Sequence, residues 1–180
     1  MGNSPLIVEY GQVIPLAIGF QIWQLLSYAF LHGSLMHIAL NMLALVMFGA
    51  PIERALGLRA FTVYYFSCVI GAAIAQLVVT HFWINGFYPT LGASGGVFGL
   101  LLAFGMLYPR SRIVLLFPPI PMPAWLFVIG YAVVELYLGV TNSAAGVAHF
   151  AHLGGMAVGL FLIQYWRGRL PIRPRRILLR

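Results

Sequence analysis

The sequence predicts an all-α polytopic membrane protein, and two observations lead to this prediction. Hydrophobic residues make up 62% of the 180 residues and charged residues only 7%, whereas a typical soluble domain carries about 25% charged residues. The apolar residues also form long unbroken runs, not the alternating segments of about ten residues that build a transmembrane barrel. A water-soluble globule is therefore excluded, and so is a disordered chain, which needs low hydrophobicity and high charge.

Five apolar segments, each bounded by arginine, proline or glycine, are the predicted membrane spans. They cover residues 35–53, 60–82, 94–108, 122–140 and 147–166. An earlier segment, 10–31, is also uncharged, but it contains Gln12, Pro15, Gly19, Gln21 and Gln24. It could form a full span, yet its polar residues favour a loop on the outer side of the membrane with short helices.

The basic residues indicate how the spans are oriented. All ten are arginines, and they lie between spans one and two, between spans three and four, and after span five. The connections 83–92 and 141–146 carry no charge. The positive-inside rule then places the arginines and the C-terminus in the cytoplasm. Because these arginines flank apolar spans and form no separate basic surface, the net charge of +7 does not indicate nucleic-acid binding.

Four polar side chains from three spans are predicted to lie at one depth. With a helical rise of about 1.5 Å per residue, Ser94 and His152 lie about 24 and 22 Å from the arginine that ends their spans. His37 and Asn41 lie about 26 and 20 Å from theirs, and they share a helix face. Such a layer inside a membrane requires a water-filled cavity that opens outward.

The residues around Ser94 favour nucleophilic catalysis. The segment 92–96 (GASGG) begins the third span, and a helix N-terminus offers unpaired N–H groups that stabilise an oxyanion. Small residues follow on one face of this span (Gly95, Gly99, Ala103), and another small face follows His152 (Gly155, Gly159). If these faces pack closely, His152 approaches Ser94 as a base approaches a nucleophile.

Two alternatives to a simple Ser94–His152 pair are a catalytic triad with an acidic third residue and a metal site. The three acids are Glu9, Glu53 and Glu135, and only Glu135 lies in the outer half of a span. Its position along the span does not place it beside His152, so we predict a Ser–His dyad. Four histidines could bind a metal (His32, His37, His149, His152). However, His32 and His37 are five residues apart and point differently on a helix, and no carboxylate completes the set. We predict neither a metal nor another cofactor.

Three segments resemble the motifs of the rhomboid intramembrane serine proteases. They are 32–41 (HGSLMHIALN), 92–95 (GASG) and 151–159 (AHLGGMAVG), in family order and with family spacing. The resemblance covers residues 20–166 and implies a helical bundle whose family core has six spans. Because the first of these precedes the loop, we expect its counterpart to be missing from this chain. We divide the chain into a first outer loop with short helices, a transmembrane catalytic domain and a basic cytoplasmic tail: 1–33, 34–166 and 167–180.

The resemblance assigns a role to each matching residue. Ser94 is the expected nucleophile and His152 the expected general base, while the Ser94 N–H, His37 and Asn41 form the oxyanion hole. His32 is expected to anchor the first loop and Phe98 to pack against the catalytic histidine. Gly92 and Gly95 belong to the serine motif. Gln24 stands where the family's first loop has an arginine after Trp23, a difference that leaves the catalytic residues unchanged.

The function implied by the resemblance is proteolysis inside the membrane. Single-pass transmembrane proteins would be the substrates, entering laterally near spans one and four, and the bacterial inner membrane would be the location. A catalytically inactive relative that binds membrane proteins is the main alternative. A histidine-based transporter of protons or metal ions is a third.

Overall fold

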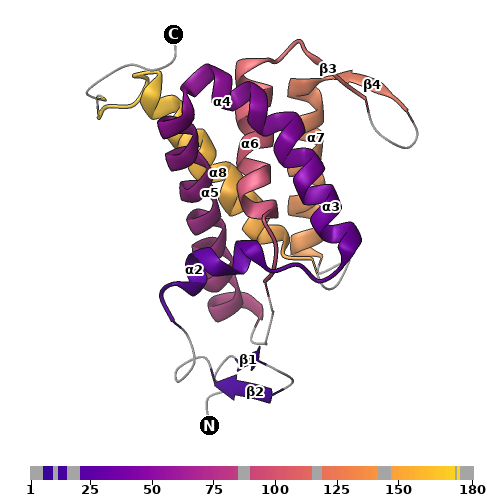
Figure 1. Cartoon of the computed structure of the whole chain (residues 1–180), viewed down its shortest axis with the longest axis vertical. Helices are drawn as coiled ribbons and strands as arrows, with labels where there is room; N and C mark the ends of the chain where they lie inside the picture. Colours follow the sequence, from indigo (N-terminus) through magenta and orange to yellow (C-terminus); the bar gives the residue numbers. More distant parts are fainter. Residues whose placement is uncertain are drawn as a thin grey trace.

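The computed structural model describes residues 6–9, 12–15, 21–84, 90–114, 119–141, 147–172 and 174. Helices dominate, as Figure 1 shows. They are α2 (Gln24–Ser27), η1 (Tyr28–Phe30), α3 (Leu35–Ala44), η2 (Leu45–Gly49), α4 (Ala50–Leu56), α5 (Leu58–Val79), η3 (Thr80–Ile84), α6 (Ser94–Leu107), α7 (Ala124–Val140) and α8 (His149–Trp166). The strands are β1 (Leu6–Glu9), β2 (Gln12–Pro15), β3 (Arg112–Val114) and β4 (Pro121–Pro123).

All five predicted spans are helical, with ends within three residues of the prediction. The first runs through α3, η2 and α4 without interruption. Ser34 begins it, because its Oγ accepts the His37 backbone N–H at 3.1 Å. Pro51 lies in the first turn of α4 and cannot donate to the carbonyl four residues back. The wider turns of η2 precede this proline and allow the helix to continue past it.

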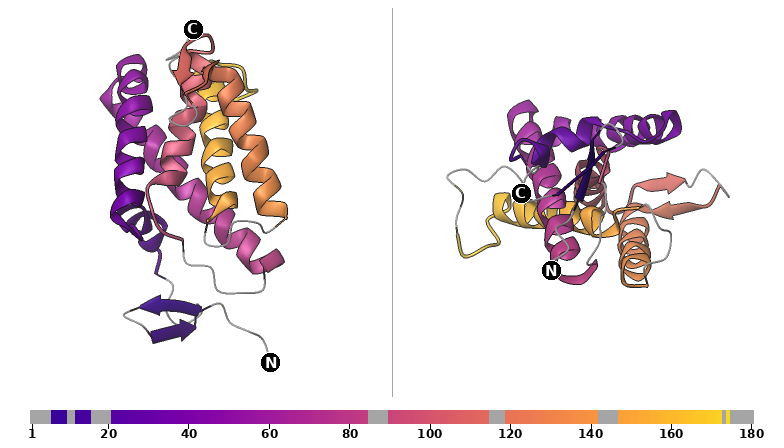
Figure 2. Two further views of the ribbon diagram at one scale, coloured as in Figure 1. Left: turned by 90° about the vertical axis from the view of Figure 1, so that its right-hand side faces the viewer. Right: turned by 90° about the horizontal axis from the view of Figure 1, so that it is seen from below.

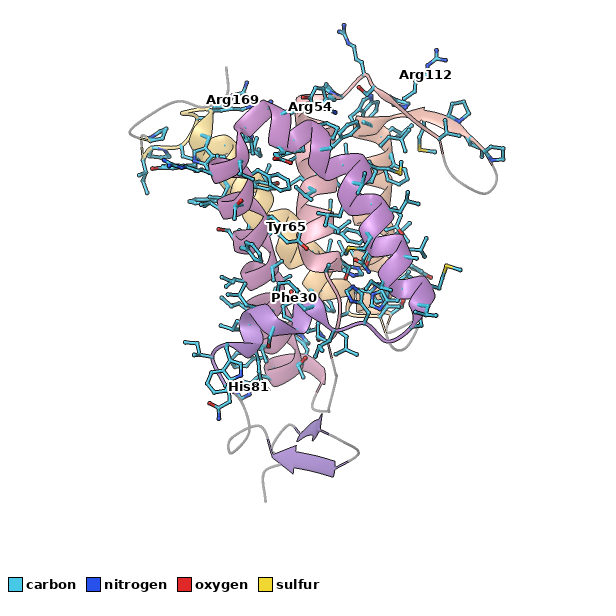
Figure 3. The ribbon with its side chains drawn as sticks, in the orientation of Figure 1. Phe30, Arg54, Tyr65, His81, Arg112 and Arg169 are labelled. Atoms are coloured by element: carbon cyan, nitrogen blue, oxygen red, sulfur yellow. The ribbon has the colours of Figure 1, made fainter. Side chains whose placement is uncertain are left out.

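Two helical stretches, Leu35–Leu56 and Leu58–Trp83, are long and apolar enough to cross a membrane, and α6 and α7 are shorter apolar helices. Among the described residues, the arginines that Figure 3 labels lie at one end of this bundle. Figure 3 shows Arg54, Arg112 and Arg169 there and His81 at the opposite end. Arginines that are far apart in the sequence therefore lie at the same end of the bundle, as the positive-inside rule predicts for a membrane protein.

Helix α8 packs against α5, α6 and α7, as the views in Figure 2 also show. The predicted contact between small-residue faces is confirmed, because a Cβ on Gly155 would collide with the Gly95 carbonyl oxygen. Helix α5 joins the same contact, which the sequence analysis did not anticipate. Tyr64 on α5 donates its hydroxyl hydrogen to the Gly99 carbonyl at 2.7 Å. Helices α5 and α8 are thus both held closely against the first half of α6.

The segment before α3 forms no long helix among its described residues, so the loop interpretation of residues 10–31 is favoured over the full span. Its short helices are α2 and η1. Tyr28 of η1 attaches this segment to the bundle: its hydroxyl donates to the Val69 carbonyl at 2.8 Å, and its carbonyl accepts the Gly92 N–H at 3.0 Å.

Two antiparallel hairpins were not predicted. In the first, β1 pairs with β2 so that Leu6 lies opposite Pro15. In the second, β3 pairs with β4 so that Arg112 lies opposite Pro123, at the arginine end of the bundle. The predicted basic tail, 167–180, is described only for residues 167–172 and 174, and the rest of it lies outside the described residues.

Candidate active site

Ser94 and His152 meet where two helices begin. Ser94 is the first residue of α6, and His152 lies in the first turn of α8. The close approach of Gly95 and Gly155 brings these two turns together. As a result, His152 Nε2 lies 2.8 Å from Ser94 Oγ, and the His152 residue is only 8% exposed. This is the hydrogen-bond distance that a nucleophile and its base require.

Phe98 holds the imidazole of His152 from the side. It lies one turn after Ser94 on α6, and its ring stacks on the His152 ring with centroids 4.1 Å apart and planes 5° from parallel. The Phe98 ring restricts rotation of the imidazole about χ2, so Nε2 stays directed toward the hydroxyl. This is the packing that the family resemblance led us to expect of Phe98.

His37 and Asn41 lie on one face of α3, facing the same cavity as Ser94. The Asn41 amide nitrogen donates to the His37 carbonyl at 2.9 Å. An amide nitrogen carries two hydrogens, so this bond orients the group and leaves its second N–H for another acceptor. The Ser94 N–H, in the first turn of α6, has no acceptor within its own helix. These donors come from two helices that converge on one cavity.

Gly92 explains why the serine motif begins with glycine. Its φ is +110°, a conformation that L side chains rarely adopt. A Cβ at this position would lie 2.7 Å from both Cε1 and Nε2 of His37. Glycine is therefore required here twice, for the backbone turn before α6 and for the close approach of the His37 ring.

His32 lies beside His37, which corrects one expectation. The two ring centroids are 5.1 Å apart in an edge-to-face arrangement. We had placed both residues on a helix, where they would diverge, but α3 begins at Leu35 and the chain turns before it. Both ring nitrogens of His32 are buried and have no hydrogen-bond partner among the described residues.

A cavity of about 820 Å³ connects these residues. Its polar lining includes His37, Asn41, Ser94 and His152, the four side chains that were predicted to lie in one layer. Its other walls are largely apolar and come from α3, η2, α6, α7 and β3, including Met47, Leu101, Ile113, Phe127 and Tyr131. The cavity therefore extends from the polar layer toward the arginine end, between the first and fourth spans.

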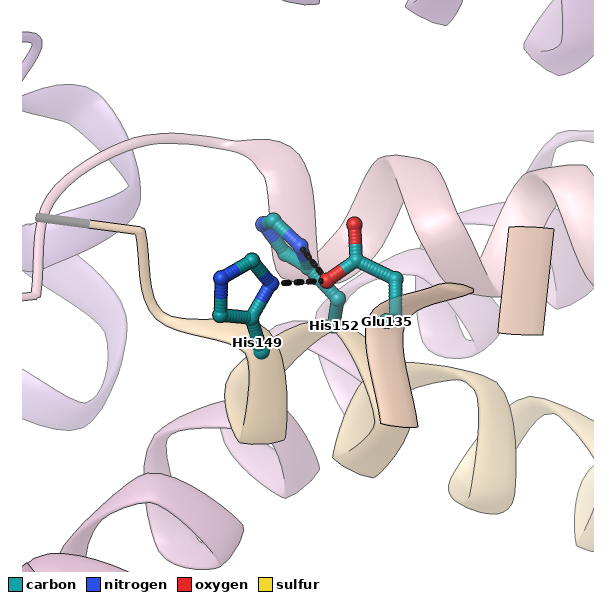
Figure 4. A group of neighbouring side chains, drawn as sticks. All are labelled: Glu135, His149 and His152. Atoms are coloured by element: carbon teal, nitrogen blue, oxygen red, sulfur yellow. Dashed lines mark hydrogen bonds and ion pairs between the residues drawn. The ribbon is translucent and has the colours of Figure 1, made fainter. Parts of the chain in front are cut away.

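The prediction for Glu135 was wrong. Its Oε2 lies 3.0 Å from His152 Nδ1 and 2.7 Å from His149 Nδ1, as Figure 4 shows. All three side chains are buried, and their potential ligand atoms lie within 4.8 Å of one another. A carboxylate therefore does accompany these two histidines, contrary to the reasoning used against a triad and against a histidine metal site. The sequence could have predicted this contact if the residues had been counted back from the end of α7 and forward from the start of α8, because these two ends lie on the same side of the membrane.

These contacts form a continuous chain from Ser94 through His152 to Glu135. The serine hydroxyl lies next to an imidazole nitrogen, and the other nitrogen of the same ring faces a carboxylate. This is the order of groups that activates a hydroxyl as a nucleophile. The chain opens on a cavity rather than into packed core, so a substrate carbonyl can approach Ser94.

Comparison with known proteins gives a consistent result. Residues 19–169 match the protein-family model described as "Rhomboid domain". The chain is 34% identical over 147 residues to "Rhomboid protein 1, mitochondrial" of Saccharomyces cerevisiae (76% of this chain, 40% of the relative). It is 34% identical over 144 residues to "RHOMBOID-like protein 4" of Arabidopsis thaliana (80% and 34%). It is 31% identical over 142 residues to "Rhomboid protease GluP" of Bacillus subtilis (77% and 25%). The matched region thus spans a quarter to two-fifths of these relatives.

Proposed function

Because this chain belongs to the rhomboid family of integral membrane proteins, we propose that it is a serine endopeptidase that hydrolyses peptide bonds of transmembrane proteins within the membrane. The observation that carries this proposal is the 2.8 Å contact between Ser94 Oγ and His152 Nε2 beside an 820 Å³ cavity. The match to a relative named as a protease supports it.

In the proposed mechanism, His152 accepts and returns the hydroxyl proton of Ser94. Ser94 Oγ attacks the carbonyl carbon of the scissile bond while its proton passes to His152 Nε2. The imidazolium then donates that proton to the leaving amine, which frees the first product and leaves an acyl-enzyme. A water molecule, deprotonated by the same imidazole, hydrolyses the ester and restores Ser94. The stacked Phe98 ring keeps the base oriented through both steps.

The negative charge of each tetrahedral intermediate requires donors at the start of α6. We assign this role to the Ser94 N–H and the free amide hydrogen of Asn41, with the His37 ring at the same cavity wall. The dipole of α6 adds to them, since its positive end lies at Ser94. Backbone and side chain thus act from two helices on one oxygen atom.

The lining of the cavity supports a proposal for the substrate class. Its apolar walls suit a segment that leaves the lipid, and the polar end suits the extended backbone that a protease must reach. We propose single-pass transmembrane proteins as substrates, with entry between α3 and α7. We propose the bacterial inner membrane as the location, and the arginine-rich end supports an orientation with the C-terminus in the cytoplasm.

A fluorophosphonate probe tests the proposed nucleophile directly. Such a probe forms a covalent bond with an activated serine, so we expect labelling of the wild-type protein in detergent and none of Ser94→Ala. The wild-type protein should also cleave a model transmembrane substrate, and Ser94→Ala should not. If wild type is neither labelled nor active while it still binds transmembrane proteins, the inactive-relative alternative is correct.

Asn41→Ala is expected to slow cleavage without abolishing it. The substitution removes one oxyanion donor while the Ser94 N–H remains, so kcat should fall about 100-fold with little change in KM. Steady-state kinetics with a fluorogenic transmembrane peptide measures this. Met42→Ala is the matched control, since Met42 is the next residue on α3 and is exposed. A kcat for Asn41→Ala equal to that of Met42→Ala would remove Asn41 from the oxyanion site.

A further inference from the structure

We infer that Glu135 is a positioning residue for the proposed reaction, and that His149 holds its carboxylate in place. The inference rests on the proposed function and adds a third and a fourth member to the Ser94–His152 pair. Figure 4 shows the geometry that supports it: two imidazoles from the first turn of α8 point toward one carboxylate oxygen of α7.

The arrangement of the two rings is specific. His149 and His152 are three residues apart on α8, with ring centroids 6.5 Å apart and planes at 88°. Despite this crossing, the Nδ1 atom of each ring lies within hydrogen-bond distance of the same Oε2 atom. Glu135 is only 5% exposed. A buried carboxylate is costly unless it is hydrogen-bonded or paired, and these two N–H groups satisfy it.

The contact determines which nitrogen of His152 carries the proton. An ionised carboxylate can only accept hydrogen bonds, so the proton of a neutral His152 must lie on Nδ1. The lone pair is then on Nε2, which lies 2.8 Å from Ser94 Oγ. In the other tautomer Nε2 would carry a hydrogen and could not accept the serine proton. Glu135 therefore keeps His152 in the form that acts as a base.

His149 contributes through Glu135 rather than through the serine. Its Nδ1 lies 2.7 Å from Oε2, against 3.0 Å for His152. During the reaction His152 changes between neutral and charged forms, and a second donor keeps the carboxylate in place through both. The Nε2 atom of His149 is buried with no hydrogen-bond partner in the described part of the chain, so the contact with Glu135 is the role that the structure shows for this ring.

The distances favour hydrogen bonds over a shared metal ion. Ligand atoms about 2.05 Å from a tetrahedral zinc ion are separated by about 3.3 Å. The separations of 2.7 and 3.0 Å from Oε2 to the two nitrogens are shorter than that. They are the distances expected for charge-assisted N–H···O bonds.

Glu135→Gln tests the inference, since it keeps the shape and removes the charge. The amide oxygen can take the place of Oε2 and still accept from both rings, but it carries no full negative charge, so it stabilises the imidazolium that forms on His152 much less. We expect kcat to fall about 100-fold, KM to stay within about twofold, and fluorophosphonate labelling to slow by a similar factor to kcat. Glu53→Gln is the matched control, because Glu53 is exposed at the opposite end of the bundle.

Two variants of His149 test the same inference even if Glu135→Gln does not fold. His149→Leu should lower kcat about tenfold with KM unchanged. His149→Asn should recover most of that loss, because its amide nitrogen can occupy the position of Nδ1 and donate to Glu135. A purely structural role would instead make both variants lose stability and activity together.

The outcomes separate the two proposals. An active wild type and an inactive Ser94→Ala, together with a Glu135→Gln kcat equal to that of Glu53→Gln, would overturn the role of Glu135 and leave the protease proposal intact. A wild-type protein that the probe does not label would overturn the protease proposal itself.

Discussion

Replacing His152 by alanine is expected to lower the rate of substrate cleavage by about 10⁴-fold or more. The variant loses the only imidazole that contacts Ser94 Oγ in the described structure, so the hydroxyl no longer has a base. Folding should survive, because Glu135 keeps its bond to His149 and α8 keeps its contacts with α5 and α6. Single-turnover cleavage and thermal unfolding in the same detergent measure the two properties separately.

His81→Ala is the control for this variant. His81 is an exposed histidine of η3, just after the end of α5, and its ring lies edge-to-face against the ring of Phe82. Its removal should leave cleavage near the wild-type rate. Substantial cleavage by a folded His152→Ala protein would overturn the assignment of His152 as the base, and with it the role proposed for Glu135.

The polar layer was predictable from the sequence because each of its spans ends at a nearby arginine. Ser94 and His152 lie on continuous helices that reach Leu107 and Trp166, close to Arg110 and Arg167. A constant rise per residue therefore gives their depth correctly. The glycines on both helices then indicated that the two would pack closely.

The same count failed for Glu135 because its span has no such marker. Arg112 precedes it, and a straight helix from there would place Glu135 about 34 Å away. The chain instead forms the β3–β4 hairpin before α7 begins at Ala124. Counted from the opposite end, Glu135 lies about 7.5 Å before the end of α7 and His152 about 4.5 Å after the start of α8. Those depths agree to within one helical turn.

The two hairpins and the position of His32 were missed for a related reason. Short strands and turns depend on contacts between segments, and apolar periodicity does not report such contacts. His32 precedes α3, so a helical angle between it and His37 has no meaning. Gly92 is the one local signal that could have indicated their proximity, since the turn before α6 needs a positive φ and leaves room for the His37 ring.

Gly155→Ala is expected to have the largest effect on the fold. The added methyl group would collide with the Gly95 carbonyl oxygen, a backbone atom that cannot rotate away. The two helices must separate or tilt, so we expect the free energy of unfolding to fall by about 3 kcal/mol. Gly95 follows Ser94 and Gly155 lies one turn after His152, so the same movement lengthens the Ser94–His152 contact. A misplacement of about 1 Å should lower cleavage about 100-fold.

Gly130→Ala distinguishes this packing effect from a general effect of methyl groups in helices. Gly130 lies on α7, and a Cβ there meets no atom within 4 Å. Alanine forms helix better than glycine by about 1 kcal/mol, so this variant should be as stable as wild type or more so, and fully active. Reversible unfolding in mixed micelles, combined with the rate of fluorophosphonate labelling, compares the pair. If Gly155→Ala behaves like Gly130→Ala in both measurements, the close contact of α6 and α8 is not what brings Ser94 and His152 together.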